Sequence, residues 1–156
     1  MVRSDFLEIM TRDFGKIEIN AEKIIVFQKG LPGFETIKKF VLLPFPGDAP
    51  FVIFQAIKKR EVAFTAVDPA DFFANYQFEI NEQTEKELKI NSRKDLMILN
   101  IINIKDEVKE STVNLAAPLV INLREKLAKQ VILDDNTYQL RCKLFNREQM
   151  QNEVAE

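Results

Sequence analysis

The stretch FVIFQAIKKREVAFTAV, from Phe51 to Val67, contains two apolar runs separated by a short charged segment. The runs Phe51 to Ile57 and Val62 to Val67 are rich in aromatic and β-branched residues, and the polar segment KKRE stands between them. Short apolar runs bounded by turn residues are typical of two strands joined as a hairpin. We therefore expect an antiparallel sheet at the centre of the fold.

Similar patterns recur on both sides of this hairpin. Strands are predicted at residues 15–20, 24–27, 38–45, 76–80, 96–104, 112–115, 119–122, 129–134 and 138–145. The segment NAEK, residues 20–23, is predicted to connect the first two of these as a hairpin, and the glycines of KGLPGFE, residues 29–35, predict a shaped turn. One helix is predicted over NEQTEKELKI, residues 81–90, with Asn81 as its N-cap.

About ten strands with turns at regular intervals favour an antiparallel barrel or sandwich. The predicted fold class is mainly β, a single-domain antiparallel β-barrel-like fold with one or two short helices. We expect residues 1–145 to form this domain and residues 146–156 to be a polar, acidic C-terminal tail.

The composition limits the classes of function. The 156 residues include 22 basic and 24 acidic ones, a formal net charge of −2, so non-specific binding to nucleic acid has no evident electrostatic source. The single cysteine, Cys142, excludes an intrachain disulfide, and Asp5 and Glu8 interrupt the apolar stretch that a signal peptide would need. Since no apolar run is long enough to cross a bilayer, we expect a cytoplasmic protein without a membrane partner.

The chain contains no histidine. This removes the most common acid–base group, the Ser-His and Cys-His nucleophile pairs and the commonest metal ligand. Glycine-rich phosphate loops are also absent, because GLPG has neither a third glycine nor a following helix start. We therefore expect no enzyme, no cofactor, no metal site and no small-molecule substrate.

Two places remained as candidates for chemistry. In VDPADF, residues 67–72, Asp68 and Asp71 stand close enough in sequence to act as paired carboxylates, but Asp68 followed by Pro69 is typical of a helix N-cap and first turn. Cys142 is flanked by two cations, yet the alternation Leu140, Cys142, Leu144 places it on the inward face of a strand as an inert thiol.

The segment STVNLAAPLVIN, residues 111–122, is uncharged and carries two amides, Asn114 and Asn122. It is predicted to be sheet in which Pro118 interrupts an edge or forms a corner, and an edge strand is where a partner segment can add itself. Gln55, the single amide in FVIFQAI, either satisfies a buried backbone group or faces a partner. Spacing alone does not separate these two readings of Gln55.

Taken in order, several of these segments resemble the flagellar assembly factor FliW family. The resemblance runs from Gly15 to about Phe145 and is most specific where NLAAPLVIN is followed by KQVIL; its segments are GKIEI (15–19), GLPGFE (30–35), FVLLPF (40–45), PFVIFQAI (50–57), AFTAVDP (63–69), ILNIINI (98–104), TVNLAAPLVIN (112–122) and AKQVIL (128–133).

The resemblance implies a cytoplasmic bacterial protein with a small β-barrel-like fold and no catalytic activity. It implies two protein partners, namely flagellin before its export and CsrA, a small RNA-binding regulator that represses translation of flagellin messenger RNA. The implied mechanism is partner exchange, in which the protein relieves this repression until unexported flagellin competes for it. Carried over by position, the expected partner-binding residues are Phe54, Gln55, Asp68, Pro69, Asn114, Pro118 and Asn122.

Two other functions compete with this one. The first is a general export chaperone for flagellin that has no regulatory partner. The second is a small-barrel enzyme that binds a flavin, which a chromophore in the purified protein would reveal.

Overall fold

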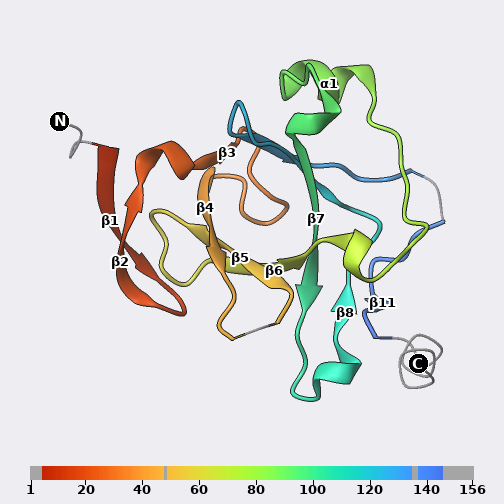
Figure 1. Cartoon of the computed structure of the whole chain (residues 1–156), viewed down its shortest axis with the longest axis horizontal. Coiled ribbons are helices and arrows are strands. Elements are labelled where there is room, and N and C mark those ends of the chain that lie inside the picture. The colour runs from red at the N-terminus through yellow and green to blue at the C-terminus, as the bar shows by residue number, and fades with distance from the viewer. Residues whose placement is uncertain (1–4, 48, 135–136, 146–156) are drawn as a thin grey trace.

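The computed structural model describes residues 5–47, 49–134 and 137–145 (Figure 1). The predicted tail, residues 146–156, lies outside the described residues. The strands are β1 (Phe6–Thr11), β2 (Gly15–Asn20), β3 (Ile25–Phe27), β4 (Lys39–Pro44), β5 (Phe51–Ala56), β6 (Ala63–Val67), β7 (Leu96–Asn103), β8 (Thr112–Val113), β9 (Leu119–Asn122), β10 (Leu127–Gln130) and β11 (Cys142–Lys143). The helix α1 (Glu82–Glu87) is accompanied by 3-10 helices at Ala21–Lys23, Pro69–Asp71, Arg93–Asp95 and Val108–Glu110.

Seven of the strands form a closed barrel. They follow one another in the order β7, β6, β5, β4, β3, β10 and β9, and β9 pairs back with β7. All of these pairings are antiparallel except the short one between β3 and β10. The predicted mainly β, single-domain, barrel-like fold is therefore confirmed.

The central hairpin is also confirmed. β5 and β6 pair from Phe51 opposite Val67 to Gln55 opposite Ala63, and β4 pairs with the other edge of β5. The apolar run of β5 is buried almost without alternation because both of its faces are covered. Phe54 and Ala56 pack in the barrel, whereas Phe51 packs in a second cluster and Gln55 is bonded to the backbone of Arg12.

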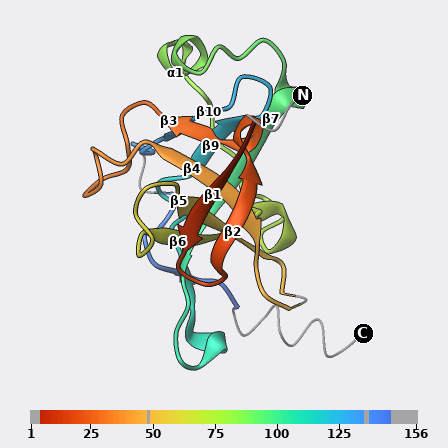
Figure 2. The same cartoon turned by 90° about the vertical axis from the view of Figure 1, so that its left-hand side faces the viewer.

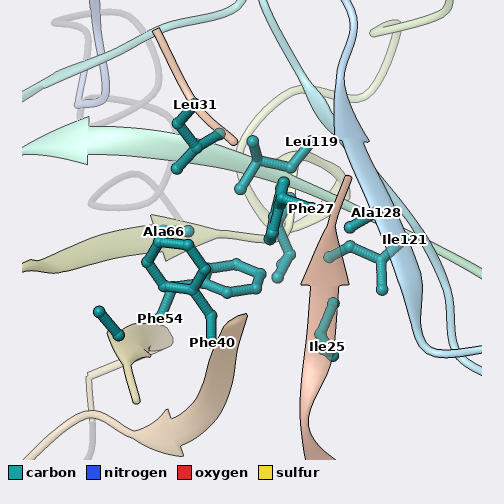
Figure 3. Packing of buried hydrophobic residues seen from close by; sticks show 11 residues of the cluster. Ile25, Phe27, Leu31, Phe40, Phe54, Ala66, Leu119, Ile121 and Ala128 are labelled. Carbon is teal, nitrogen blue, oxygen red and sulfur yellow. The ribbon is translucent and has the colours of Figure 1, made fainter. Parts of the chain in front are cut away.

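The barrel is filled by phenylalanine rings and aliphatic side chains (Figure 3). The rings of Phe27 and Phe40 meet edge to face with their centroids 5.4 Å apart, and Phe54 meets Phe27 in the same way at 5.8 Å. None of the three is more than 1% exposed. Edge-to-face contacts of this kind add to the free energy gained by removing the rings from water.

A second cluster lies where β8 and β11 extend the sheet beyond the barrel. Val113 and Leu144 are fully buried there against Ile102 of β7 and Phe51 of β5. β8 pairs with the last residues of β7, and β11 pairs with β8.

β1 and β2 form a separate two-stranded sheet that lies against the outside of the barrel (Figure 2). Ile9 and Ile19 are buried on its inner face together with Val41 of β4. Alternation predicted β2, whereas β1 was missed. The predicted hairpin across residues 20–23 is wrong, because Asn20 caps a 3-10 turn and the chain then enters β3, which pairs with β4 and β10 instead of β2.

The turn after β3 depends on Gly30. Its φ is +66°, and a Cβ at this position would lie 2.6 Å from the Cα of Glu35. Glycine is therefore required both for the conformation and for the close approach of two backbone segments.

Residues 81–90 contain the predicted helix in a shorter form, Glu82–Glu87. The side chain of Asn81 accepts a hydrogen bond from the amide of Thr84 at 2.8 Å, so the predicted N-cap is confirmed. The cap satisfies one of the amides that the first turn leaves without a partner inside the helix.

Three strand predictions need correction. Residues 76–80 contain no strand, because side chains hold this segment: Tyr138 Oη donates to the carbonyl of Gln77 and accepts from its amide, both at 3.0 Å. The predicted strand 138–145 is reduced to Cys142–Lys143, and Leu140 is 65% exposed instead of facing inward. The strand predicted at 129–134 begins earlier and ends at Gln130.

The edge predicted around Pro118 is absent. β9 pairs with β7 along one side and β10 along the other, so all four of its residues are buried. Pro118 instead forms a corner before β9, and its carbonyl accepts from the amide of Val131 at 2.9 Å.

Candidate protein-interaction site

Gln55 lies in the wall of the barrel and is fully buried. Its Oε1 accepts a hydrogen bond from the backbone amide of Arg12 at 2.9 Å. Its Nε2 lies 3.1 to 3.3 Å from the carbonyl oxygens of Ala56, Lys59, Arg60 and Val62 and donates toward them. Of the two readings that the sequence left open, the structure shows the first: the amide satisfies backbone groups.

Gln55 thereby ties two turns together. The carbonyls around its Nε2 belong to the β5–β6 turn, and Arg12 lies in the β1–β2 turn. Arg12 adds a second link, because its Nη1 donates to the carbonyl of Ala63 at 2.8 Å while Asp13 binds the rest of the guanidinium. Phe54, next to Gln55, points into the barrel and is 1% exposed.

Asp68 and Pro69 follow β6 directly. Asp68 Oδ1 accepts from the amide of Ala70 at 2.9 Å, and Pro69 occupies the start of the 3-10 helix, as the cap prediction required. Asp68 is exposed and Pro69 is buried. Among the described residues, no group of three or more carboxylates or cysteines is arranged to hold a metal ion.

Asn114 belongs to a small polar network with Asn100 of β7 and Tyr76. Its Oδ1 accepts from the amide of Ala116 at 3.1 Å, and its carbonyl accepts from Asn100 Nδ2 at 2.9 Å. Tyr76 Oη donates to the carbonyl of Leu115 at 2.7 Å and accepts from Asn100 at 3.1 Å. Burial is the main reason that the pKa of Tyr76 rises to about 12, with the Asn100 hydrogen bond opposing the rise.

Asn122 ends β9 and is 1% exposed. Its Nδ2 donates to the carbonyls of Leu88 and Lys89 at 2.8 and 3.1 Å, and its Oδ1 accepts from the amides of Arg124 and Glu125. One side chain thus joins the end of α1 to the β9–β10 turn.

The seven residues expected from the sequence lie in four separate places, one of which is the 3-10 helix after β6 that holds Asp68 and Pro69. Gln55 holds the β1–β2 and β5–β6 turns, Asn114 holds the corner before β9, and Asn122 holds the β9–β10 turn. Asp68 is exposed and Asn114 is half-buried, whereas the other five, Phe54, Gln55, Pro69, Pro118 and Asn122, are buried. Direct contact with a partner stays a prediction for all seven, and for the buried ones it requires an indirect role through the loops they hold.

Sequence reasoning missed a cleft between β6 and β7. These strands pair only at Val67 with Asn100 and at Ala66 with Ile101 and then diverge. The cleft measures about 420 Å³ and is lined by Arg12, Asp13, Phe45, Pro46 and residues of the diverging strand ends, including Phe64 and Ile104.

Backbone groups of β6 point toward this opening. The amide of Ala56 donates to the carbonyl of Val62, so the backbone of Val62 faces β5 and strand alternation turns Ala63 and Thr65 the opposite way. The Arg12 guanidinium donates a hydrogen bond to the Ala63 carbonyl. The cleft therefore offers a mixed polar and apolar surface, and no sequence pattern of β6 or β7 alone predicts it because the divergence is a property of their pairing.

A smaller cleft of about 220 Å³ lies beside α1. At its wall, Glu87 accepts from Lys29 at 3.1 Å and from Lys129 at 2.8 Å, which joins α1 to β10 and to the turn after β3. Hydrogen bonds from Lys129, Gln83 and Lys29 lower the pKa of Glu87 to about 2. This cluster holds three elements together.

Cys142 is half-buried, and burial raises the pKa of its thiol. A raised pKa keeps the thiol protonated and unreactive near neutral pH. The flanking cations therefore do not activate it. None of the helices in the described part of the chain has the length and apolar character needed to span a membrane.

Comparison with known proteins gives one consistent result. The family model described as FliW protein matches residues 8–144. The flagellar assembly factor FliW of Bacillus licheniformis is 44% identical over 83% of this chain and 91% of its own, and that of Clostridium kluyveri is 36% identical over 91% and 98%. A crystal structure of the flagellar assembly factor FliW is 34% identical and superposes with a TM-score of 0.86 over 91% of this chain and 99% of that chain. The chain therefore belongs to the FliW family of flagellar assembly factors.

Proposed function

We propose that this protein acts in the cytoplasm by binding two other proteins, flagellin and CsrA, and that it catalyses no reaction. The observation that supports this most strongly is membership of the flagellar assembly factor family in a chain without histidine. In the free state the protein holds CsrA away from flagellin messenger RNA. Unexported flagellin then competes for the protein, releases CsrA and restores repression of its own translation.

The described surface fits a role in binding. It has a cleft between β6 and β7 that is lined by polar and apolar residues, while its buried amides are used to hold loops. A net charge of −2 permits approach to a basic regulator, because opposite potentials favour encounter. Of the seven residues named from the sequence, Asp68 and Asn114 contribute by contact. The buried five contribute indirectly, Phe54 through the barrel core and the others through the loops beside them.

A titration of purified flagellin into a preformed complex with purified CsrA tests the exchange. Size-exclusion chromatography is expected to show CsrA leaving the complex as flagellin enters it. A ternary complex that retains CsrA contradicts exchange. Flagellin binding without any CsrA binding instead identifies a plain export chaperone.

Two substitutions test the loop system around β9. Asn114→Ala and Asn122→Ala are expected to weaken binding of flagellin or CsrA in calorimetry, since each releases a loop that its side chain holds. Asn91→Ala, at an exposed position, is the matched control. If both variants bind like the control, this region is not part of the binding surface.

A further inference from the structure

The strand β1 has a free edge. It pairs with β2 along its whole length, from Phe6 opposite Asn20 to Thr11 opposite Gly15, and within the described residues no strand pairs with its other edge. Proteins commonly protect such edges with lysine, proline or a bulge. Residues 6–11, FLEIMT, contain neither lysine nor proline, their one charged residue is Glu8, and the register with β2 is continuous.

The outer face beside this edge carries exposed apolar side chains. Phe6 is 47% exposed and Met10 is 43% exposed, although Ile9 and Ile19 on the opposite face are buried against the barrel. Phe6 and Met10 therefore take no part in packing the hairpin on the barrel. Exposed apolar groups next to an open strand edge are typical of a surface to which an extended segment is added.

The outer face of the hairpin carries two glutamates whose repulsion destabilises the hairpin. Glu8 and Glu18 stand directly opposite each other, and like charges in such a cross-strand pair are destabilising. Lys16 reaches Glu8 at 3.1 Å, and no ion pair of Glu18 is found within the described residues. A basic side chain from outside would relieve this repulsion.

The same charges disfavour a second copy of this chain as the added strand. Antiparallel pairing of β1 with its own copy over the full outer face sets Glu8 against Glu8 and Phe6 against Met10. Glu18 stands next to Glu8 in each copy, so this register collects four carboxylates in one row. The charge pattern therefore selects a different partner, and one that is basic.

The hairpin is held in place before any partner arrives. The amide of Arg12 is bonded to Gln55, and the guanidinium of Arg12 to the carbonyl of Ala63, so the hairpin tip is attached to β5 and β6. A strand edge that is already ordered loses less conformational entropy when a segment binds to it.

We propose that β1 accepts an extended segment of a partner protein as the third strand of the β1–β2 sheet. The segment carries a lysine or arginine opposite Glu8, with apolar residues opposite Phe6 and Met10. This inference deepens the proposed function and rests on it, because it names the chemistry of the protein segment that docks.

The substitution Glu18→Lys separates binding from folding. It replaces a repulsive cross-strand pair by an attractive one, so the variant is expected to fold with an equal or higher Tm. Binding of purified flagellin or purified CsrA, measured by calorimetry, is expected to weaken at least tenfold for the one that docks on β1. Glu107→Lys makes the same charge change at an exposed position in the β7–β8 loop and is expected to stay within twofold of the wild type.

A second variant removes the apolar part without changing charge. Phe6→Ser combined with Met10→Ser is expected to weaken the same partner at least tenfold. If the wild type binds a partner and both variants bind it equally well, the docking strand is refuted while the proposed function stands. If the wild type binds neither flagellin nor CsrA, the docking strand and the proposed function are both refuted. If the wild type sediments as a dimer and the double variant as a monomer, β1 pairs with a second copy of this chain, and the proposal of a different protein partner is refuted.

Discussion

The barrel and the β1–β2 hairpin use similar residues in opposite ways. In the barrel, Phe40 and Phe54 are at most 1% exposed and the amide of Gln55 is bonded at both ends. In the hairpin, Phe6 and Met10 are more than 40% exposed and two glutamates face each other. Folding accounts for the residues of the barrel. It does not account for the outer face of the hairpin, so this face is free for a role other than folding.

The largest effect is expected in the barrel core. Phe40→Ala removes a fully buried ring that contacts Phe27 and Phe64, and about 3–5 kcal/mol of unfolding free energy should be lost. Phe6→Ala is the control on the hairpin and should change stability by less than about 0.5 kcal/mol. Chemical denaturation measures both. Similar losses for the two variants would contradict the contrast between the regions.

The link between the two regions is the next target. Gln55→Ala leaves the Arg12 amide and several carbonyls without their partner and should cost about 1–3 kcal/mol in urea denaturation. Hydrogen exchange at the Arg12 amide should accelerate. Gln28→Ala, on an exposed side chain, should be neutral. Unchanged stability together with lost partner binding would mean that Gln55 acts by contact.

A smaller effect is expected where charge stabilises the barrel. The pKa of Glu87 is about 2, below its ordinary value of 4.5, so its stabilising contribution is complete above pH 4.5 and is lost as the pH falls toward 2. Pairs at this level of exposure usually contribute less than about 1 kcal/mol each. Wild type and Glu87→Gln should differ in Tm at pH 7 and converge below pH 4.5. A difference that is as large at pH 2.5 as at pH 7 would exclude the carboxylate as its cause.

The smallest effect concerns the hairpin itself. Glu18→Lys should raise the unfolding free energy by about 0.2–1 kcal/mol, because an opposite-charge cross-strand pair replaces a like-charge pair. Thermal unfolding at low and high salt measures it, and the gain should shrink as salt screens the pair. A loss of stability at low salt would show that Glu18 has a structural role in the hairpin.

Most of the barrel was predictable because its strands have strong local patterns. β5 and β6 are uninterrupted apolar runs around a charged turn, and the caps at Asn81 and Asp68 follow from short-range hydrogen bonding. Residues 76–80 alternate like a strand, but tertiary contacts of Tyr76 and Tyr138 override that preference. β1 was missed because its outer residues include Phe6 and Met10, which break the alternation of apolar and polar residues.

The candidate site was less predictable than the fold. Asn114 and Asn122 stand out in the sequence as amides, and the local bonds of their Oδ1 atoms to Ala116 and to Arg124 are of the kind that short-range patterns predict. The bonds of Asn122 Nδ2 to Leu88 and Lys89 join segments that are distant in sequence, and no local pattern predicts them. The cleft between β6 and β7 arises from the divergence of two strands, and the free edge of β1 from the absence of a neighbour. Such features belong to the arrangement of elements, which single-sequence patterns do not contain.

Tyr76 gives the protein a built-in optical reporter. The chain has two tyrosines and no tryptophan. The hydroxyl of Tyr76 joins the segment that precedes α1 to the carbonyl of Leu115. With a pKa of about 12, this phenol stays protonated while the corner is closed. Phenolate absorbance that appears at lower pH and is absent from Tyr76→Phe would therefore signal that the corner has opened.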